Sequence, residues 1–269
     1  MEIAYGMVFL SLFSISTLAG IALRHRLPDE HFSKENMEAV RLVTSLLVTF
    51  AALILSLQLS NARSSFDTAN SDRSTYAARL TNLDQCLRDL GSSLDPARLQ
   101  LRQYTAAIIA STWPTESKPS VEGMPDTTHM ALRGEDPALA RLFDEVGLAI
   151  ASYNPSEGRD AVVSRRCQTS FEMAEQTRWA VIEDTHARSG IFFILIIAFW
   201  LSLVFLSFGL QIPLKRMTAV VLAIGVVSIS SVMFVIVDLD LPYRGFFSIS
   251  SSAMRDALAD MSGTRSSAR

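Results

Sequence analysis

The sequence predicts an all-α membrane protein in which four helices span the bilayer and a helical soluble domain is inserted between spans two and three. Four uncharged apolar runs of about 18 to 21 residues are each long enough to cross a hydrocarbon core of about 30 Å. Between the second and third runs the chain is charged, and its apolar residues recur every three or four positions, which is typical of amphipathic helices. Only 19% of the 269 residues are charged, below the roughly 25% of a typical soluble domain, as expected when much of a chain lies in lipid.

The first apolar run extends from Ile3 to Leu23 and ends at a basic turn, Arg24-His25-Arg26. A cleaved signal peptide also has an apolar core, but here no basic residue precedes the run and the run is longer than a usual signal core. We therefore predict a retained span. Together with the second span it forms a first transmembrane helix pair over residues 1–60.

The second run, Leu42 to Leu59, continues without a helix breaker into a polar segment that starts at Asn61. We predict one long helix that leaves the membrane and enters the soluble domain. Small and hydroxyl side chains recur along the run at spacings of 3 and 4, which places them on one helix face. We call this face the hydroxyl stripe: Ser45, Thr49, Ala52, Ser56 and Ser60. Larger apolar residues form a second stripe, the leucine stripe: Leu46, Phe50, Leu53 and Leu57.

Two interpretations of the hydroxyl stripe stay open. Small residues let membrane helices approach one another closely, so the stripe is a candidate helix-packing face. Alternatively, the hydroxyls line a water-filled path, in which case the stripe is a candidate pore lining.

Residues 61–189 are expected to form the helical soluble domain. A heptad pattern follows the second span, and Gly91 ends that helix; its residues are Tyr76, Leu80, Leu83, Leu87 and Leu90. The Asp-Pro pairs at 95–96 and 136–137 are typical of helix starts. Between these helices, scattered Pro and Gly predict a mobile loop at about 115–133. The last soluble helix, about 157–189, is predicted to lead directly into the third span.

Residues 190–237 are expected to form the second transmembrane helix pair, Ile191 to Leu210 and Met217 to Val237. Residues 238–269 then form an interfacial turn, a short helix from Ser251 to Met261 and a disordered tail. The turn holds a candidate interface motif, Asp238, Asp240, Pro242 and Gly245. Three roles are open for its carboxylates: they end the span, they contact a cation or backbone amides, or they place negative charge at the mouth of a pore.

No enzyme is expected from this sequence, and no cofactor. It has no phosphate-binding loop of the type G-x-x-x-x-G-K-S/T, no H-E-x-x-H, no C-x-x-C and no G-x-S-x-G. Its four histidines are scattered, so we predict no metal site. A net charge of -3 provides no basic field for nucleic acid. Cys86 and Cys167 could pair only if their domain faces an oxidising compartment, and the sequence leaves that open.

Charge gives only a slight preference for orientation. Four spans place both termini and the helical domain on one side of the membrane and the short loops on the other. The short loops carry Arg24, Arg26, Lys34, Arg41, Lys215 and Arg216. Within about twenty residues of the span ends, the other side carries as many basic residues: Arg63, Arg73, Arg178, Arg188, Arg244 and Arg255. The amino terminus, which has no basic side chain before Arg24, slightly favours short loops inside the cell.

From about Leu27 to Met261 the chain resembles the bestrophin-like family of bacterial membrane proteins, a domain of unknown function. The resemblance rests on short motifs in a fixed order: Ser64-Ser65-Phe66-Asp67, Leu83-Asp84, Trp113-Pro114, Gln176-Thr177-Arg178-Trp179, Phe199-Trp200-Leu201, Ser207-Phe208-Gly209-Leu210, Asp240-Leu241-Pro242-Tyr243-Arg244-Gly245 and Ile249-Ser250-Ser251. It implies a multi-pass protein of the bacterial inner membrane with four spans and a helical insertion.

The family's name points further, to bestrophins, which are pentameric anion channels whose second span lines the pore and whose large domain is cytosolic. The resemblance therefore implies a homo-oligomer, with a pentamer expected, in the lipid bilayer. The chain has no acidic run like the calcium clasp of animal bestrophins, so calcium gating is not carried over. Our leading hypothesis is an oligomeric anion channel lined by the hydroxyl stripe. The alternative is a membrane-anchored signalling or interaction protein that uses its long helices to transmit a signal or dock a partner.

Overall fold

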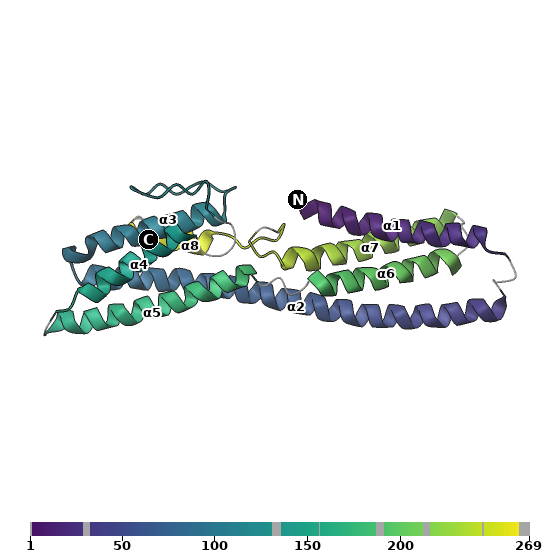
Figure 1. The fold of residues 1–269 in the computed structure, drawn as a ribbon, viewed down its shortest axis with the longest axis horizontal. Helices are drawn as coiled ribbons and strands as arrows, with labels where there is room; N and C mark the ends of the chain where they lie inside the picture. Colours follow the sequence, from purple (N-terminus) through teal and green to yellow (C-terminus); the bar gives the residue numbers. More distant parts are fainter. Residues whose placement is uncertain are drawn as a thin grey trace. The chain divides into compact units, whose positions relative to one another are not determined.

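The computed structural model describes residues 2–28, 33–130, 136–155, 157–186, 191–211, 216–243 and 245–263, and these residues form helices and no strand. Four of the helices are long and apolar enough to cross a membrane, which confirms the predicted fold class. In chain order the helices are α1 (Glu2–Arg26), α2 (Lys34–Asp89), the 3₁₀ turn η2 (Ser92–Leu94), α3 (Asp95–Thr112), α4 (Pro137–Ser152), α5 (Arg159–His186), α6 (Ile191–Gln211), α7 (Arg216–Leu239) and α8 (Ser252–Met261) (Figure 1).

The chain divides into two compact units. The membrane unit comprises Met1–Phe66 and Arg188–Ser248, and the helical unit comprises Asp67–Ala187 and Ile249–Arg269. Helix α2 contributes its first part to the membrane unit and its second part to the helical unit, as the unbroken pattern after Leu59 predicted.

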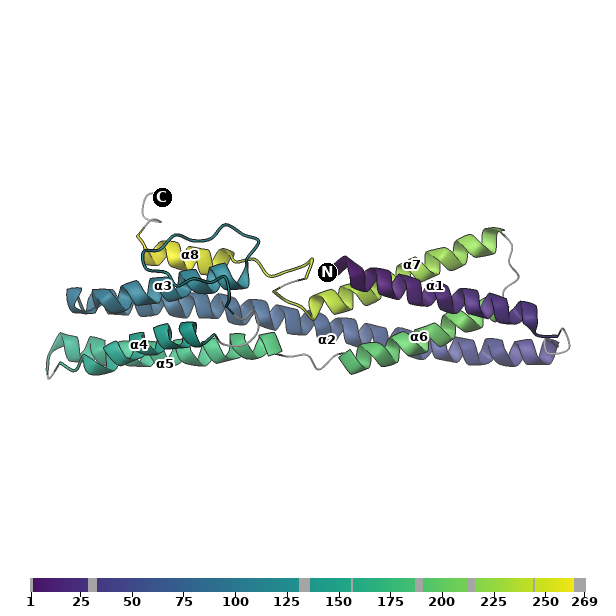
Figure 2. The same cartoon turned by 45° about the horizontal axis from the view of Figure 1, so that its top comes forward.

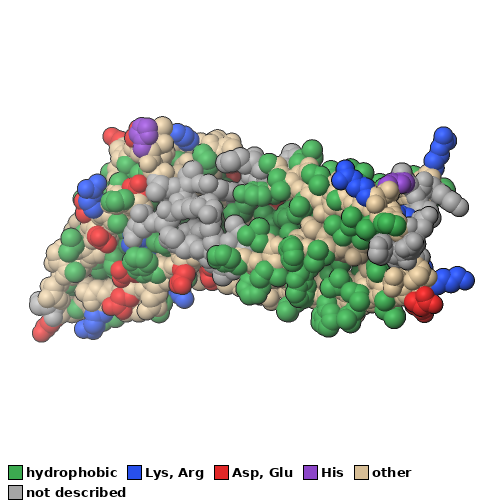
Figure 3. Space-filling model, turned by 45° about the vertical axis from the view of Figure 1, so that its right-hand side comes forward, with side chains coloured by type: hydrophobic (Ala, Val, Ile, Leu, Met, Phe, Trp, Pro, Cys, Tyr) green, Lys and Arg blue, Asp and Glu red, His purple; other side chains and the backbone are tan. Residues whose placement is uncertain are grey.

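In the membrane unit, α1 packs against both α6 and α7, while α6 and α7 touch each other little. The core holds aromatic and aliphatic side chains from several helices, with the rings of Phe13 and Phe205 stacked 5.2 Å apart. At most 33% of the most apolar window of each spanning helix is buried, so most of that surface faces outwards. Figure 3 shows hydrophobic side chains covering the visible face of this unit, with basic side chains gathered at its end.

In the helical unit, α3 packs against α4 and α8, and α4 packs against α5 (Figure 2). All five residues of the predicted heptad pattern are buried, including Leu90 just beyond the end of α2, and Leu80, Leu83 and Leu87 are fully so. Tyr104 of α3 and Phe143 of α4 complete this core, with their ring centroids 5.1 Å apart. The apolar spacing along α2 therefore identified its buried face.

Local chemistry explains two helix ends, whereas a third departs from the prediction. Asp136 caps α4 by accepting a hydrogen bond from the amide of Ala138 at 2.8 Å, and Gly91 adopts a φ of 85° where α2 ends. Asp95, in contrast, is no cap. The turn η2 precedes it, Leu94 takes the cap position, and the Asp95 carboxylate instead pairs with Arg98 at 3.2 Å.

The segment between α3 and α4 has no helix among its described residues, as predicted, and is tied down at several points. Trp113 Nε1 donates to the carbonyl oxygen of Ile249 at 2.7 Å, and Gln103 Nε2 donates to that of Glu122 at 2.8 Å. The mobility of this loop stays a prediction. The predicted continuation from α5 into the third span involves residues 187–190, which lie outside the described residues, as do residues 264–269 of the expected tail.

Candidate functional site

The membrane part of α2 carries three separate stripes. Its contact with the rest of the membrane unit is a packed stripe of four buried residues, Thr44, Ala51, Leu55 and Ala62. Three of them share a core cluster with residues of α6 and α7, such as Leu201 and Met233. At about 100° per residue, the packed stripe lies well away from both the hydroxyl stripe and the leucine stripe. All members of those two stripes are exposed in the single chain.

The hydroxyl stripe is therefore not the face with which α2 packs inside its own chain. Ser45, Thr49, Ala52, Ser56 and Ser60 all face outwards. The Thr49 hydroxyl donates to the carbonyl oxygen of Ser45 at 2.9 Å, and such a bond satisfies the donor while leaving the oxygen lone pairs open. The polar contact that fixes α2 is on the packed stripe instead, where Gln211 Nε2 donates to Thr44 Oγ1 at 2.7 Å.

The predicted interface motif forms a tight turn after α7. Asp238 is buried, and its carboxylate oxygens accept hydrogen bonds from the amides of Phe246 and Phe247 at 2.7 and 2.9 Å. Gly245 is required here, since a Cβ at that position would lie 2.7 Å from the Asp238 carbonyl oxygen. Asp238 thus fixes the turn through backbone amides.

The remaining motif residues serve the same turn. Pro242 follows the end of α7 within a turn, and the Gly245 amide donates to the carbonyl oxygen of Leu241 at 2.9 Å. Burial raises the pKa of Asp240, which lies just beyond the helix. A role of this motif at a subunit interface or pore mouth stays a prediction.

A buried arginine marks the centre of the helical unit. Arg178 of α5 is only 4% exposed, and its guanidinium carbon lies 4.8 Å from the centroid of the Phe143 ring, which is cation–π distance. Beside it, the hydroxyls of Tyr76 and Tyr104 are 2.6 Å apart and share a hydrogen bond. Burial raises the pKa of both tyrosines, so both hydroxyls stay protonated. Arg178 interrupts the apolar residues that recur every three or four positions along α5, and this interruption was the sequence signal for the arrangement.

Several motif residues behind the resemblance serve the fold. Asp84 is 1% exposed and forms ion pairs with Arg88 at 2.8 Å and Arg98 at 3.1 Å. Trp113 anchors its loop to the segment before α8, as described above. Glu116 in the same loop accepts hydrogen bonds from Ser251 and Arg255, which holds the pKa of its carboxyl below the ordinary value. These polar contacts fix the packing of the helical unit.

Acidic residues towards the end of α5 are typical of a solvated face, and Asp184 departs from that pattern: Glu172, Glu175, Glu183 and Asp184. One of the Asp184 carboxylate oxygens is buried without a hydrogen-bond partner among the described residues. Burial, together with the nearby charges of Asp72 and Glu183, raises the pKa of Asp184 to about 6. This carboxyl therefore titrates near neutral pH. Across the described part of the chain, no group of three or more His, Cys, Asp or Glu side chains is arranged to hold a metal ion.

Comparisons with known proteins agree with this architecture. A family model described as "Bestrophin-like domain" matches residues 11–254. A crystal structure of a point mutant of a bacterial bestrophin homolog from Klebsiella pneumoniae has a TM-score of 0.64 at 12% identity, covering 94% of this chain and 97% of that chain. A second point mutant of the Klebsiella homolog has a TM-score of 0.65 at 15% identity, with 97% and 98% covered.

A crystal structure described as a membrane protein has a TM-score of 0.68 at 13% identity, covering 98% of this chain and 99% of that chain. At these identities the structural likeness shows a common fold. The chain matches no curated protein.

Proposed function

Because this chain belongs to the bestrophin-like family, we propose that it is a subunit of an oligomeric anion channel in the bacterial inner membrane, with its second span lining the pore. The observation that carries the proposal is the outward orientation of the hydroxyl stripe on α2. A polar face on a spanning helix is best placed against water or another protein surface, and among the described residues of its own chain none covers this one.

The three stripes of α2 match the surroundings of a pore-lining helix. Such a helix contacts its own subunit, a neighbouring subunit and the central path. In this proposal the packed stripe makes the first contact, the leucine stripe the second, and the hydroxyl stripe faces the path. The leucine stripe is well suited to a neighbouring copy, since Leu53 and Leu57 are 67% and 61% exposed.

The chemistry of the stripe suits an anion. The span from Leu42 to Leu59 contains no carboxylate, so no charged side chain along it repels a negative ion. The Ser45, Ser56 and Ser60 hydroxyls can donate hydrogen bonds to an anion that has lost part of its hydration shell, and Thr49 can do so when its bond to the Ser45 carbonyl opens.

The first experiment is the oligomeric state of the detergent-purified protein, measured by mass photometry. A discrete ring of about five subunits would support the proposal, whereas a monomer or dimer would leave no central path and would refute it.

The second experiment is anion flux into liposomes. We expect Thr49→Leu and Ser56→Leu to reduce the flux, because each replaces a hydroxyl on the stripe by a larger apolar group. A matched control is Ser228→Leu on α7, which makes the same change at an exposed position of another span. Wild-type flux in both stripe variants would refute the pore assignment.

One observation favours a second candidate function, a membrane-anchored signalling or interaction protein. The single helix α2 belongs to both units and could carry a displacement from one to the other. Absence of flux in a monomeric or dimeric protein, together with a partner captured by the helical unit, would favour this candidate.

A further inference from the structure

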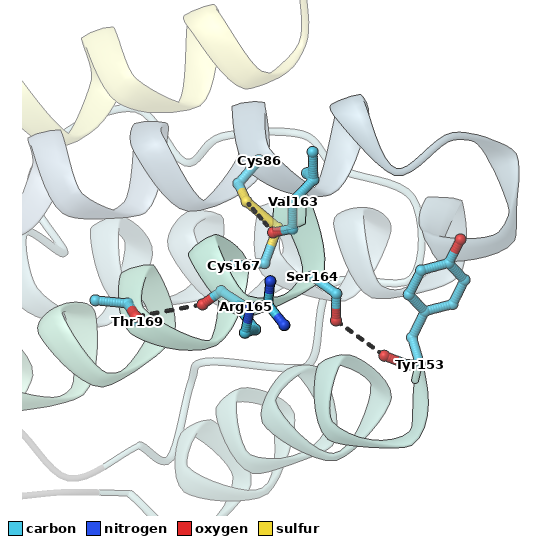
Figure 4. Close-up of a disulfide and its surroundings, with 7 residues drawn as sticks. All are labelled: Cys86, Tyr153, Val163, Ser164, Arg165, Cys167 and Thr169. Carbon is cyan, nitrogen blue, oxygen red and sulfur yellow. Dashed lines mark hydrogen bonds between the residues drawn. A yellow bond between two sulfur atoms is a disulfide. The ribbon is translucent and has the colours of Figure 1, made fainter. Parts of the chain in front are cut away.

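The helical unit contains a disulfide between the only two cysteines of the chain. Figure 4 shows Cys86 of α2 bonded to Cys167 of α5, with the Cys86 sulfur 3.7 Å from the carbonyl oxygen of Val163. The two Cα atoms are 5.5 Å apart, within the usual range for a disulfide. Both side chains are buried, at 4% and 0% exposed.

Helix packing, rather than a flexible loop, brings these cysteines together. They are 81 residues apart in sequence. About two turns from the disulfide along the same helices, Arg79 of α2 donates a hydrogen bond to the sulfur of Met173 of α5 at 3.3 Å. From the Cys86–Cys167 pair to the Arg79–Met173 pair, the residue number falls by seven on α2 and rises by six on α5. The two helices therefore run antiparallel and keep their register between these contacts. The folded helical unit therefore holds the two sulfur atoms at bonding distance.

A stable buried disulfide has consequences for the compartment. Disulfides form and persist where the environment is oxidising, and they are rare in the reducing cytoplasm. The helical unit follows the second span and precedes the third, so in a four-span chain it lies across the membrane from both short loops. We propose that the helical unit lies on the oxidising side of the membrane and that the two short loops lie in the cytoplasm. This orientation is opposite to the one implied by bestrophins, and it holds whether or not the protein conducts ions.

The charge distribution gives a slight preference for the same orientation. The two sides carry equal numbers of basic residues near the span ends, and those on the short-loop side are Arg24, Arg26, Lys34, Arg41, Lys215 and Arg216. No basic side chain precedes Arg24 at the amino terminus, and this tips the balance towards short loops inside the cell. The last turn of α1 is itself basic. Basic short loops are typical of the cytoplasmic side.

The chemistry of bridge formation requires an oxidant of a definite class. Pairing removes two protons and two electrons from the Cys86 and Cys167 thiols. A disulfide-bearing oxidoreductase of the exported compartment accepts them: one thiolate attacks its disulfide to give a mixed disulfide, the second cysteine displaces the enzyme thiolate, and the oxidoreductase leaves as the dithiol.

The wild-type chain provides the first test. Cells are quenched in acid and then alkylated with a polyethylene-glycol maleimide, with and without prior reduction. We expect no adduct before reduction and two adducts after it. Two adducts without reduction would mean that the thiols are free in the cell, and this would overturn the proposal.

The second test locates the helical unit directly. In a Cys86→Ala, Cys167→Ala background, one new cysteine is placed at exposed Ser93, after α2, or at exposed Glu35, in the first turn of α2. With a membrane-impermeant maleimide, Ser93→Cys should label in intact cells and Glu35→Cys only after permeabilisation. The reverse pattern would overturn the proposal. If the Cys86→Ala, Cys167→Ala variant is not inserted into the membrane, the alkylation of the wild-type protein by itself tests the proposal.

Discussion

Gly20 of α1 and Gly209 of α6 meet so closely that neither position has room for a side chain. A Cβ at Gly20 would lie 2.2 Å from the carbonyl oxygen of Leu206 and 3.0 Å from the Cα of Gly209. A Cβ at Gly209 would lie 2.3 Å from the carbonyl oxygen of Thr17. Because backbone atoms cannot move aside as flexible side chains do, this pair sets the distance between the two helices.

Gly20→Ala and Gly209→Ala should each destabilise the membrane unit. Forcing a methyl group into a packed site costs about 1–3 kcal/mol, so the thermal midpoint in detergent should fall. Gly225→Ala on α7 is the control, since a Cβ there meets nothing within 4 Å. Equal midpoints for all three variants would contradict the role of the glycine pair.

Removing the Asp238 carboxylate should destabilise the turn after α7. Asp238→Ala leaves the amides of Phe246 and Phe247 without their acceptor, and a hydrogen bond to a charged group contributes about 1.5–3 kcal/mol. Asp238→Asn retains one acceptor oxygen and should be milder. Differential scanning fluorimetry in detergent would rank the two variants, and the opposite ranking would argue against this role.

Stability should fall as the pH rises through the titration of Asp184. Its pKa is raised from 3.8 to about 6, so the folded protein binds this proton more tightly than the unfolded chain. The stabilising contribution is present below the unfolded pKa and is lost as the pH rises through the folded pKa. Asp184→Asn should therefore raise the thermal midpoint more at about pH 7.5 than at about pH 5. Glu172→Gln, an exposed change on the same helix, is the control. The same gain at both pH values would rule out Asp184 as the cause.

Reduction should loosen the helical unit. Removing a native disulfide typically costs about 2–5 kcal/mol, because the unfolded chain gains freedom. We expect a reductant to lower the thermal midpoint of the oxidised wild type. A Cys86→Ala, Cys167→Ala variant should start from the lower value and show no response. A similar drop in the variant would show that the reductant acts elsewhere.

The stripes of α2 show which features of the candidate site a sequence pattern can predict and which it cannot. The 3–4 spacing places the members of the hydroxyl stripe on one face of α2 without any structure, because helix periodicity is local. The sequence could not determine which face of α2 packs against the rest of the chain, because the packed and leucine stripes are both largely apolar. Ala51 is buried in one cluster with residues of α1, α6 and α7, and Thr44 accepts a hydrogen bond from Gln211 of α6, whereas Ser45 and Ala52 stay exposed.

The sequence by itself determined the four spans, the long helix α2 and the heptad core of the helical unit. These features depend on the length of apolar runs, the placement of charged residues and the spacing of apolar residues, all of which are properties of short stretches of sequence. Only the tertiary structure decided that α1 packs against both α6 and α7 and that Cys86 is bonded to Cys167. It also decided that the Asp184 carboxyl is partly buried and that Leu94, rather than Asp95, occupies the cap position of α3. Each of these depends on which surfaces meet across long stretches of chain, and close packing selects among alternatives that local chemistry leaves nearly equal.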